Sequence, residues 1–428
     1  MQLIEELKSN ITIEKLQNNN DRPLIIFGAG AIGEMTYHAC KEYGLEVVCF
    51  ADDKMKGILK GLDIVHTNEL KKRYIDPIFL ICSPNIKDMT ERLRDLDYSE
   101  WYSCGVVLKG FEVFPEHCNT ALQEKIDPNR SPRAERELEQ DYVDYLVSSC
   151  ILAQESFMDP KKLFTKNIDL VITEKCSMAC VDCSNLMPYF ESPRNYTLEI
   201  LMHAIDILCQ YFDEIYEVRV IGGEPFMNKD FHQIVKRLTQ EPKVGKVAIY
   251  TNGTIVPNEV QLEELKHEKL FLYITDYGKL SRNLEKLVAK LQENNIFHYV
   301  HKATGWTDCA SIKKHNRTAD ENIDLFKKCC ATNLATVSEN KLFRCPFAAN
   351  ALQFKGIPDH PDDYIDLQKL EESNIGSVEA SQRIKQFLLD KEYIPACDFC
   401  AGRSYGDPDI TPGIQTKEKR AYVKYERD

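Results

Sequence analysis

The chain has 428 residues, of which 43% are hydrophobic and 28% are charged, and its formal net charge is −13. This length exceeds one ordinary hydrophobic core and predicts two or three domains. The acidic balance argues against broad attraction to nucleic acid or to an anionic membrane surface. The N-terminus lacks the apolar stretch of a signal peptide, and no run of about 18 apolar residues occurs. We therefore expect a cytoplasmic protein with no nucleic-acid partner and no membrane association.

The chain contains 16 cysteines, an unusual number for the cytoplasm, where thiols stay reduced. Cys40, Cys49, Cys82 and Cys209 lie within apolar patterns, which is typical of cysteines that fill a hydrophobic core. The remaining cysteines include clusters, and clustered thiols in a cytoplasmic protein predict metal binding.

The first part of the chain alternates between apolar runs and helical segments. Residues 24–27 form a continuous apolar strand, a helical stretch follows to Tyr43, and further strands are expected at residues 45–50 and 78–82. Alternation of this kind predicts a parallel sheet with helices. We interpret residues 1–118 as a Rossmann-like domain.

A glycine loop separates the first strand of this domain from its first helix. Gly28, Gly30 and Gly33 follow the G-x-G-x-x-G pattern, and Asp52 ends the next strand about 20 residues later. The helix N-terminus is suited to phosphates, and Asp52 to a ribose. The loop resembles those of small Rossmann-like domains attached to bacterial sugar-modifying enzymes, which implies a nucleotide-sugar. NAD is a second candidate, and a domain that kept the fold without a ligand is a third.

A second alternation of strands and helices begins after a helical linker at residues 119–165. Five or six successive βα units over residues 166–305 predict a partial (β/α)6 barrel, whose site gathers where the strands end. The expected strands are residues 168–172, 218–221, 247–250, 271–274 and 297–300, and the main helices are 198–211, 231–238 and 281–292.

Three cysteines directly follow the first strand of this second domain. Cys176, Cys180 and Cys183 are spaced so that one loop can surround a single face of a [4Fe–4S] cube. Fully ligated clusters use four cysteines, so one iron would remain free for a substrate or cofactor. A structural zinc site needs four ligands, so three cysteines do not complete one. The spacing resembles the signature of the radical S-adenosylmethionine (SAM) superfamily.

This resemblance implies a cluster that binds SAM through its free iron and cleaves it to a 5′-deoxyadenosyl radical, supplied with electrons by a donor such as flavodoxin or ferredoxin. Asp182 stands where members often carry an aromatic residue near the adenine. Further segments at strand ends are similar to cofactor-binding segments of the family. These residues are Gly222, Gly223, Glu224, Pro225, Thr251, Asn252 and Asp276. For Asp276, an ordinary strand-end cap is the alternative.

The last part of the chain, residues 306–428, is irregular and rich in cysteine. Residues 334–337 and 341–344 predict a hairpin with cysteines before and after it. The pattern resembles the SPASM and twitch extensions of the same superfamily, and the cysteine count fits one auxiliary [4Fe–4S] cluster. A zinc site is the rival interpretation. The candidate ligands are Cys329 or Cys330, with Cys329 slightly preferred, and Cys345, Cys397 and Cys400.

The predicted function is a radical SAM enzyme of α/β fold, with the Rossmann-like domain, the partial barrel and the cysteine-rich extension in that order. The domain combination resembles proteins of bacterial surface-glycan pathways, which implies a sugar or nucleotide-sugar substrate. A peptide is the next candidate. An NAD-dependent oxidoreductase with electron-relay clusters and a non-catalytic metal-binding scaffold are the rival classes. No catalytic acid, base or hydrogen donor is identifiable from the sequence.

Overall fold

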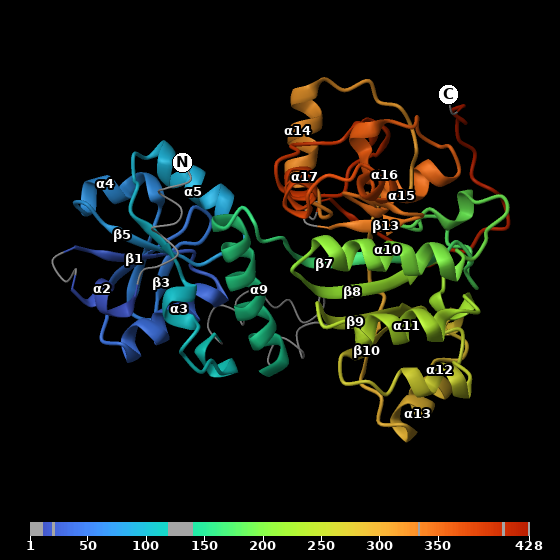
Figure 1. Cartoon of the computed structure of the whole chain (residues 1–428), viewed down its shortest axis with the longest axis horizontal. Coiled ribbons are helices and arrows are strands. Elements are labelled where there is room, and N and C mark those ends of the chain that lie inside the picture. The colour runs from blue at the N-terminus through green and yellow to red at the C-terminus, as the bar shows by residue number, and fades with distance from the viewer. Residues whose placement is uncertain (1–11, 19–21, 119–139, 333, 405–406, 427–428) are drawn as a thin grey trace. The chain divides into compact units, whose positions relative to one another are not determined.

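The protein is described from a computed structural model, which covers residues 12–18, 22–118, 140–332, 334–404 and 407–426. The chain divides into two compact units, residues 1–164 and 165–428 (Figure 1). The expected α/β class with parallel sheets is confirmed in both units. Among the described residues, no helix is long and apolar enough to span a membrane.

The first unit is built on a six-stranded sheet in the order β3-β4-β2-β1-β5-β6. β1 lies between β2 and β5 and runs parallel to both, so the direction of chain winding reverses beside it. All four residues of β1 are buried, as expected for a parallel strand covered on both faces. Its elements are α2 (Ile13–Gln17), β1 (Leu24–Phe27), α3 (Ala31–Glu42), β2 (Val47–Ala51), β3 (Gly57–Leu59), β4 (Leu62–Val65), α4 (Leu70–Arg73), β5 (Ile78–Ile81), α5 (Ile86–Asp95), β6 (Trp101–Ser103), α6 (Gly105–Leu108) and α9 (Gln140–Met158).

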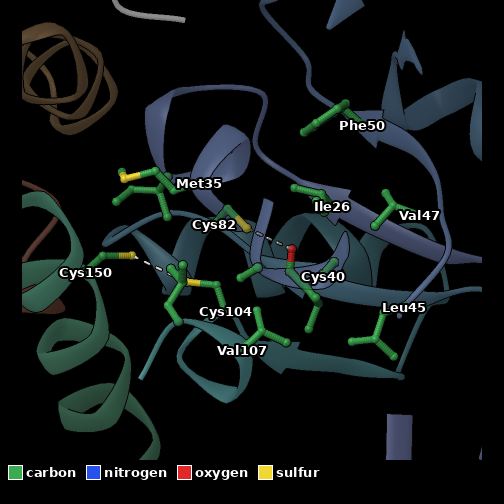
Figure 2. Close-up of a cluster of buried hydrophobic side chains, with 14 of the residues drawn as sticks. Ile26, Met35, Cys40, Leu45, Val47, Phe50, Cys82, Cys104, Val107 and Cys150 are labelled. Atoms are coloured by element: carbon green, nitrogen blue, oxygen red, sulfur yellow. Dashed lines mark hydrogen bonds between the residues drawn. The ribbon is translucent and has the colours of Figure 1, made fainter. Parts of the chain in front are cut away.

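Cysteines fill part of the core of this unit (Figure 2). Cys40, Cys49 and Cys82 are buried, and so is Cys209 of the second unit, which confirms their interpretation as core residues. Figure 2 also shows Cys104 and Cys150, whose sulfur atoms lie 3.8 Å apart. Both are buried in the same cluster of apolar side chains.

Helix α9 differs from the expectation of a separate linker at residues 119–165. Val143, Cys150 and Ile151 of α9 pack in the core of the first unit. Gln154 donates from Nε2 to the carbonyl oxygens of Ile81 and Ser83, both at 2.9 Å. The apolar face of α9 thus completes this core. Residues 119–139 of the expected linker lie outside the described residues.

The second unit contains an eight-stranded open sheet in the order β11-β10-β9-β8-β7-β13-β14-β15. β8, β9, β10 and β11 pair with one another in parallel, and helices α10 and α11 cover one face of this part (Figure 1). The elements are β7 (Phe164–Thr173), α10 (Leu198–Tyr211), β8 (Glu214–Gly222), α11 (Phe231–Gln240), β9 (Val244–Thr251), α12 (Glu259–Glu264), β10 (Leu270–Asp276), α13 (Leu284–Glu293), β11 (His298–Lys302), β12 (Trp306–Thr307), α14 (Ala319–Lys328), β13 (Thr336–Ser338), β14 (Lys341–Phe343), α15 (Pro346–Gln353), β15 (Tyr364–Asp366), α16 (Leu367–Glu372), α17 (Ser377–Leu389) and β16 (Asp409–Ile410).

The cysteine-rich end of the chain extends this same sheet, and its strands β12 and β16 pair antiparallel in a separate two-stranded sheet. β13 pairs in parallel with β7, and β14 and β15 continue antiparallel from it. The expected hairpin is present as β13 and β14. Its two turn residues, Glu339 and Asn340, both have positive φ, which matches the right-handed twist of hairpin strands.

Candidate functional site

The three-cysteine segment 176–183, here called the cysteine loop, follows the end of β7 and is held by the C-terminal tail. The backbone N–H of Val181 donates to Ile414 O at 2.7 Å, and that of Thr416 donates to Ala179 O at 2.8 Å. Gln415 adds two side-chain contacts: its Oε1 accepts from Ala179 N at 2.8 Å and its Nε2 donates to Cys180 Sγ at 3.1 Å. Residues 414–416 of the tail therefore hold the cysteine loop in place. The local sequence pattern did not predict this contact.

The three thiols of this loop lie close to one another. Burial, and then the neighbouring Cys183 and Cys180, raise the pKa of Cys176 to about 12. Burial raises the pKa of Cys180 to about 11, with Cys183 as a further cause. Tyr277, just beyond β10, has all three cysteines as electrostatic neighbours. One buried and two partly buried thiols that converge in this way fit one face of an iron–sulfur cube, which takes its protein ligands as thiolates.

Two glycines allow a turn after β8 to pack directly against the cysteine loop. A Cβ added to Gly223 would lie 2.2 Å from Lys175 O and 2.7 Å from Cys176 Cβ. A Cβ added to Gly222, whose φ is +145°, would lie 2.1 Å from Thr173 O. The sequence suggested that these glycines admit a cofactor. In the structure the close approach is between the turn and the backbone that carries the first cysteine.

Glu224 is fully buried at the end of this turn. Its carboxylate accepts from Thr251 Oγ1 at 2.9 and 3.0 Å and from Asn252 N at 3.0 Å. Burial raises the pKa of Glu224 to about 7. Asn252 in turn donates from Nδ2 to Ser177 Oγ at 3.2 Å and toward Cys176 Sγ at 3.6 Å. A continuous polar network thus connects the ends of β8 and β9 with the first cysteine.

Other predicted residues lie at the same edge with different contacts. Asp276, at the end of β10, accepts from Gly278 N at 2.7 Å and so caps its own turn. Pro225 is buried and opens a short 3-10 helix. Asp182 lies 4.0 Å from Arg420 of the tail. Tyr277 was missed by the sequence analysis, because nothing in its local pattern marks a side chain that faces three distant thiols.

A second group of cysteines, here called the four-cysteine site, comprises Cys329, Cys345, Cys397 and Cys400. Cys329 ends α14, Cys345 precedes α15, and the other two lie on the 3-10 turn at Pro395–Phe399 and directly after it. Each of the last three has Cys329 as an electrostatic neighbour. The structure brings these four thiols together from three segments spread over residues 329–400.

Backbone N–H groups point at two of these sulfur atoms. Ala331 N lies 3.4 Å from Cys329 Sγ, and Ala348 N, in the first turn of α15, lies 3.5 Å from Cys345 Sγ. Such donors stabilise a thiolate. Over the described part of the chain, no three His, Cys, Asp or Glu side chains are close enough to hold a single metal ion. In a [4Fe–4S] cluster each thiolate binds a different iron, so this spacing is compatible with a cluster.

The glycine loop of the first unit has the geometry of a tight strand-to-helix turn. Gly28 has a φ of +110°, and a Cβ on Gly33 would lie 1.9 Å from Gly28 O. Gly30 caps α3. Asp52 lies at the loop, but its carboxylate accepts from the backbone N–H groups of Ala29, Lys54 and Met55 at 2.8 to 3.0 Å. Its oxygens thus stabilise the loop itself.

The comparison with known families agrees with the geometry of the cysteine loop. Residues 170–338 match the model of the radical SAM superfamily. This chain therefore contains a radical SAM domain. Its cofactors are therefore a [4Fe–4S] cluster and SAM.

Among curated proteins, the chain is similar to two enzymes named GTP 3′,8-cyclase. The one from Clostridium acetobutylicum is 23% identical over 150 residues, which cover 30% of this chain and 45% of that protein. The one from Clostridium perfringens strain 13 is 22% identical over 209 residues, 43% of this chain and 61% of that protein. The chain therefore spans less than two thirds of the length of these relatives.

Solved structures that match part of this chain have low sequence identity to it. BtrN in complex with AdoMet and 2-DOIA is 15% identical with a TM-score of 0.36, over 61% of this chain and 99% of BtrN. SuiB of Streptococcus suis bound to SAM is 14% identical with a TM-score of 0.29, over 52% of this chain and 53% of SuiB.

Proposed function

We propose that this chain is an enzyme that reductively cleaves SAM and abstracts a hydrogen atom from a carbon of its substrate. The observation that carries the proposal is the convergence of the three thiols of the cysteine loop with the ends of β8, β9 and β10. In α/β proteins with parallel strands, reactive groups gather at this edge of the sheet. An electron donor such as flavodoxin or ferredoxin would supply the reducing electron.

When bound, the cluster and SAM supply an electron and a 5′-deoxyadenosyl radical. The residues of the chain prepare the site for them. Cys176, Cys180 and Cys183 hold three irons, and the amide of Asn252 donates toward the Cys176 sulfur. The buried carboxylate of Glu224 orients the backbone N–H of Asn252. Tyr277 lies close to the three thiols, which together with burial raise the pKa of its hydroxyl.

We further propose that the four-cysteine site holds an auxiliary [4Fe–4S] cluster. The support is the convergence of four thiols with backbone donors at two of them. Cys329 is favoured over Cys330 as the ligand, because Cys329 is the electrostatic neighbour common to the other three cysteines. Cys330 hydrogen-bonds to the side chain of Cys329 and is then a neighbour of the cluster, not a ligand. A zinc ion is the rival occupant, although among the described residues no three thiols lie close enough to hold a single ion.

The proposed substrate is a sugar or nucleotide-sugar, with a peptide as the second candidate. Support for a nucleotide comes from the first unit, where the glycine loop precedes a 12-residue helix and Gly28 adopts a positive φ. Backbone N–H groups at such a helix start bind phosphates. Isothermal calorimetry of the full chain with nucleotide-sugars and with NAD tests this assignment. Absence of binding at millimolar ligand would leave the loop as a structural element only.

Anaerobic reconstitution of the full chain with iron and sulfide, followed by an assay for 5′-deoxyadenosine, tests the central proposal. Reduced protein with SAM should release 5′-deoxyadenosine and methionine. Replacing Cys176, Cys180 and Cys183 together with alanine should remove about four irons and abolish the release. Cleavage at the wild-type rate in this triple variant would refute the proposal. Reduction of NAD without release of 5′-deoxyadenosine would indicate the rival oxidoreductase. Absence of both reactions would indicate a non-catalytic metal-binding scaffold.

A further inference from the structure

Two arginines are buried against the four-cysteine site. Arg344 directly precedes Cys345, and Arg403 follows Cys400 by three residues. Only 4% of Arg344 and 6% of Arg403 is exposed. The electrostatic neighbours of Arg344 are Cys345, Cys397 and Cys329, three of the four members of the site.

Neither of these buried guanidinium groups is matched by a carboxylate. Arg344 donates to the backbone oxygens of Phe387 at 2.9 Å and Thr332 at 2.7 Å. Within the residues that the structure describes, no Asp or Glu lies in salt-bridge distance of either arginine, although many exposed arginines of this chain have such partners. A buried charge without an opposite charge is strongly unfavourable. The two arginines therefore indicate that an anion occupies their surroundings.

The contacts of Arg403 show where this anion belongs. Its Nη2 donates to Ser184 O at 3.0 Å, and its positive charge lowers the pKa of Cys400, which burial raises. Its Nε is buried and has no hydrogen-bond partner in the described part of the chain. Cys345 and Cys400 are among its electrostatic neighbours. Arg403 thus lies close to thiols of the four-cysteine site, and also close to Cys309 and to Cys183 of the cysteine loop.

We propose that Arg344 and Arg403 are the counter-charges of the iron–sulfur cluster at the four-cysteine site and raise its reduction potential. The inference rests on the auxiliary cluster proposed above. Four thiolates give the cluster a net negative charge, and reduction adds one electron to it. A nearby cation in a poorly polarisable interior stabilises the more negative, reduced state. These arginines are positioning residues that act through the cluster and are not catalytic residues.

A redox titration of the auxiliary cluster alone tests this inference. The parent is the full chain with Cys176, Cys180 and Cys183 replaced by alanine, so that any iron signal comes from the four-cysteine site. Arg344→Gln and Arg403→Gln are compared with the parent by electron paramagnetic resonance at defined potentials. Each should lower the midpoint potential, which reduces the ratio of reduced to oxidised cluster at a fixed potential on the order of tenfold. Arg383→Gln is the matched control, because Arg383 is exposed on α17 and pairs with Glu379.

The lysine variants separate charge from shape. Arg344→Lys and Arg403→Lys keep the charge and should keep a midpoint potential near that of the parent. If glutamine variants lose iron while lysine variants retain it, the requirement for charge is upheld. An unchanged potential in both glutamine variants, or loss of iron in glutamine and lysine variants alike, would overturn the inference. A parent with zinc or no iron would instead overturn the proposed auxiliary cluster, before any arginine is changed.

Discussion

The contact between the Gly-Gly turn and the cysteine loop leads to a sharp prediction for Gly223→Ala. The new Cβ would lie 2.2 Å from Lys175 O and 2.7 Å from Cys176 Cβ. Ordinary contacts of this kind need more than 3.4 Å, so one backbone segment must move by about 1 Å. Because the obstacle is backbone, this movement displaces the first cysteine. Overpacking of this kind costs about 1–3 kcal/mol, and we expect the upper part of that range.

Two measurements check this prediction. Chemical denaturation of the metal-free protein should show a lower free energy of unfolding, and reconstituted protein should lose most of the iron held by the cysteine loop. Iron is best counted in a background in which Cys345, Cys397 and Cys400 are alanine. Gly376→Ala is the matched control, because no heavy atom lies within 4 Å of its added Cβ. It should change stability by less than about 0.5 kcal/mol. Wild-type iron content together with wild-type stability in Gly223→Ala would refute the packing argument.

Three further predictions concern other parts of the chain. The pKa of Glu224 is raised to about 7, so its stabilising contribution is present below its unfolded pKa near 4.5 and is lost as the pH rises through 7. Between pH 4 and pH 8, the metal-free wild type should lose up to about 3 kcal/mol of unfolding free energy relative to the Glu224→Gln variant. If the difference in unfolding free energy between the two proteins does not change with pH, the prediction is wrong. Gln415→Ala removes the contact with Cys180 Sγ, so a chelator should extract iron from the cysteine loop several-fold faster. Lys417 is exposed and lies two residues further on, so Lys417→Ala is the control and should behave like wild type. Gly33→Ala places a Cβ 1.9 Å from Gly28 O and should destabilise the first unit by about 1–3 kcal/mol without changing the iron spectrum; an altered spectrum would show that the loop affects the second unit.

Local pattern in the sequence was sufficient for many of the elements and for the three-cysteine signature of the cysteine loop. The alternation of apolar runs and helical segments predicted β7 to β10 within a few residues and α10 at both ends, because periodicity and a capping Thr197 act over one or two turns. Cysteine spacing on one loop is equally local, so the radical SAM signature could be read without a structure. The hairpin at β13 and β14 was predicted for the same reason.

Tertiary structure alone decided which distant segments meet at the site. Gln415 contacts a cysteine 235 positions earlier, and Arg403 reaches Ser184 across 219 positions. Periodicity and spacing carry no information on such contacts. The same limit explains why α9 was taken for a linker. It also explains why Gly222 and Gly223 were assigned to the cofactor: a sequence shows that backbone must approach closely at a glycine, but only the fold shows what approaches it.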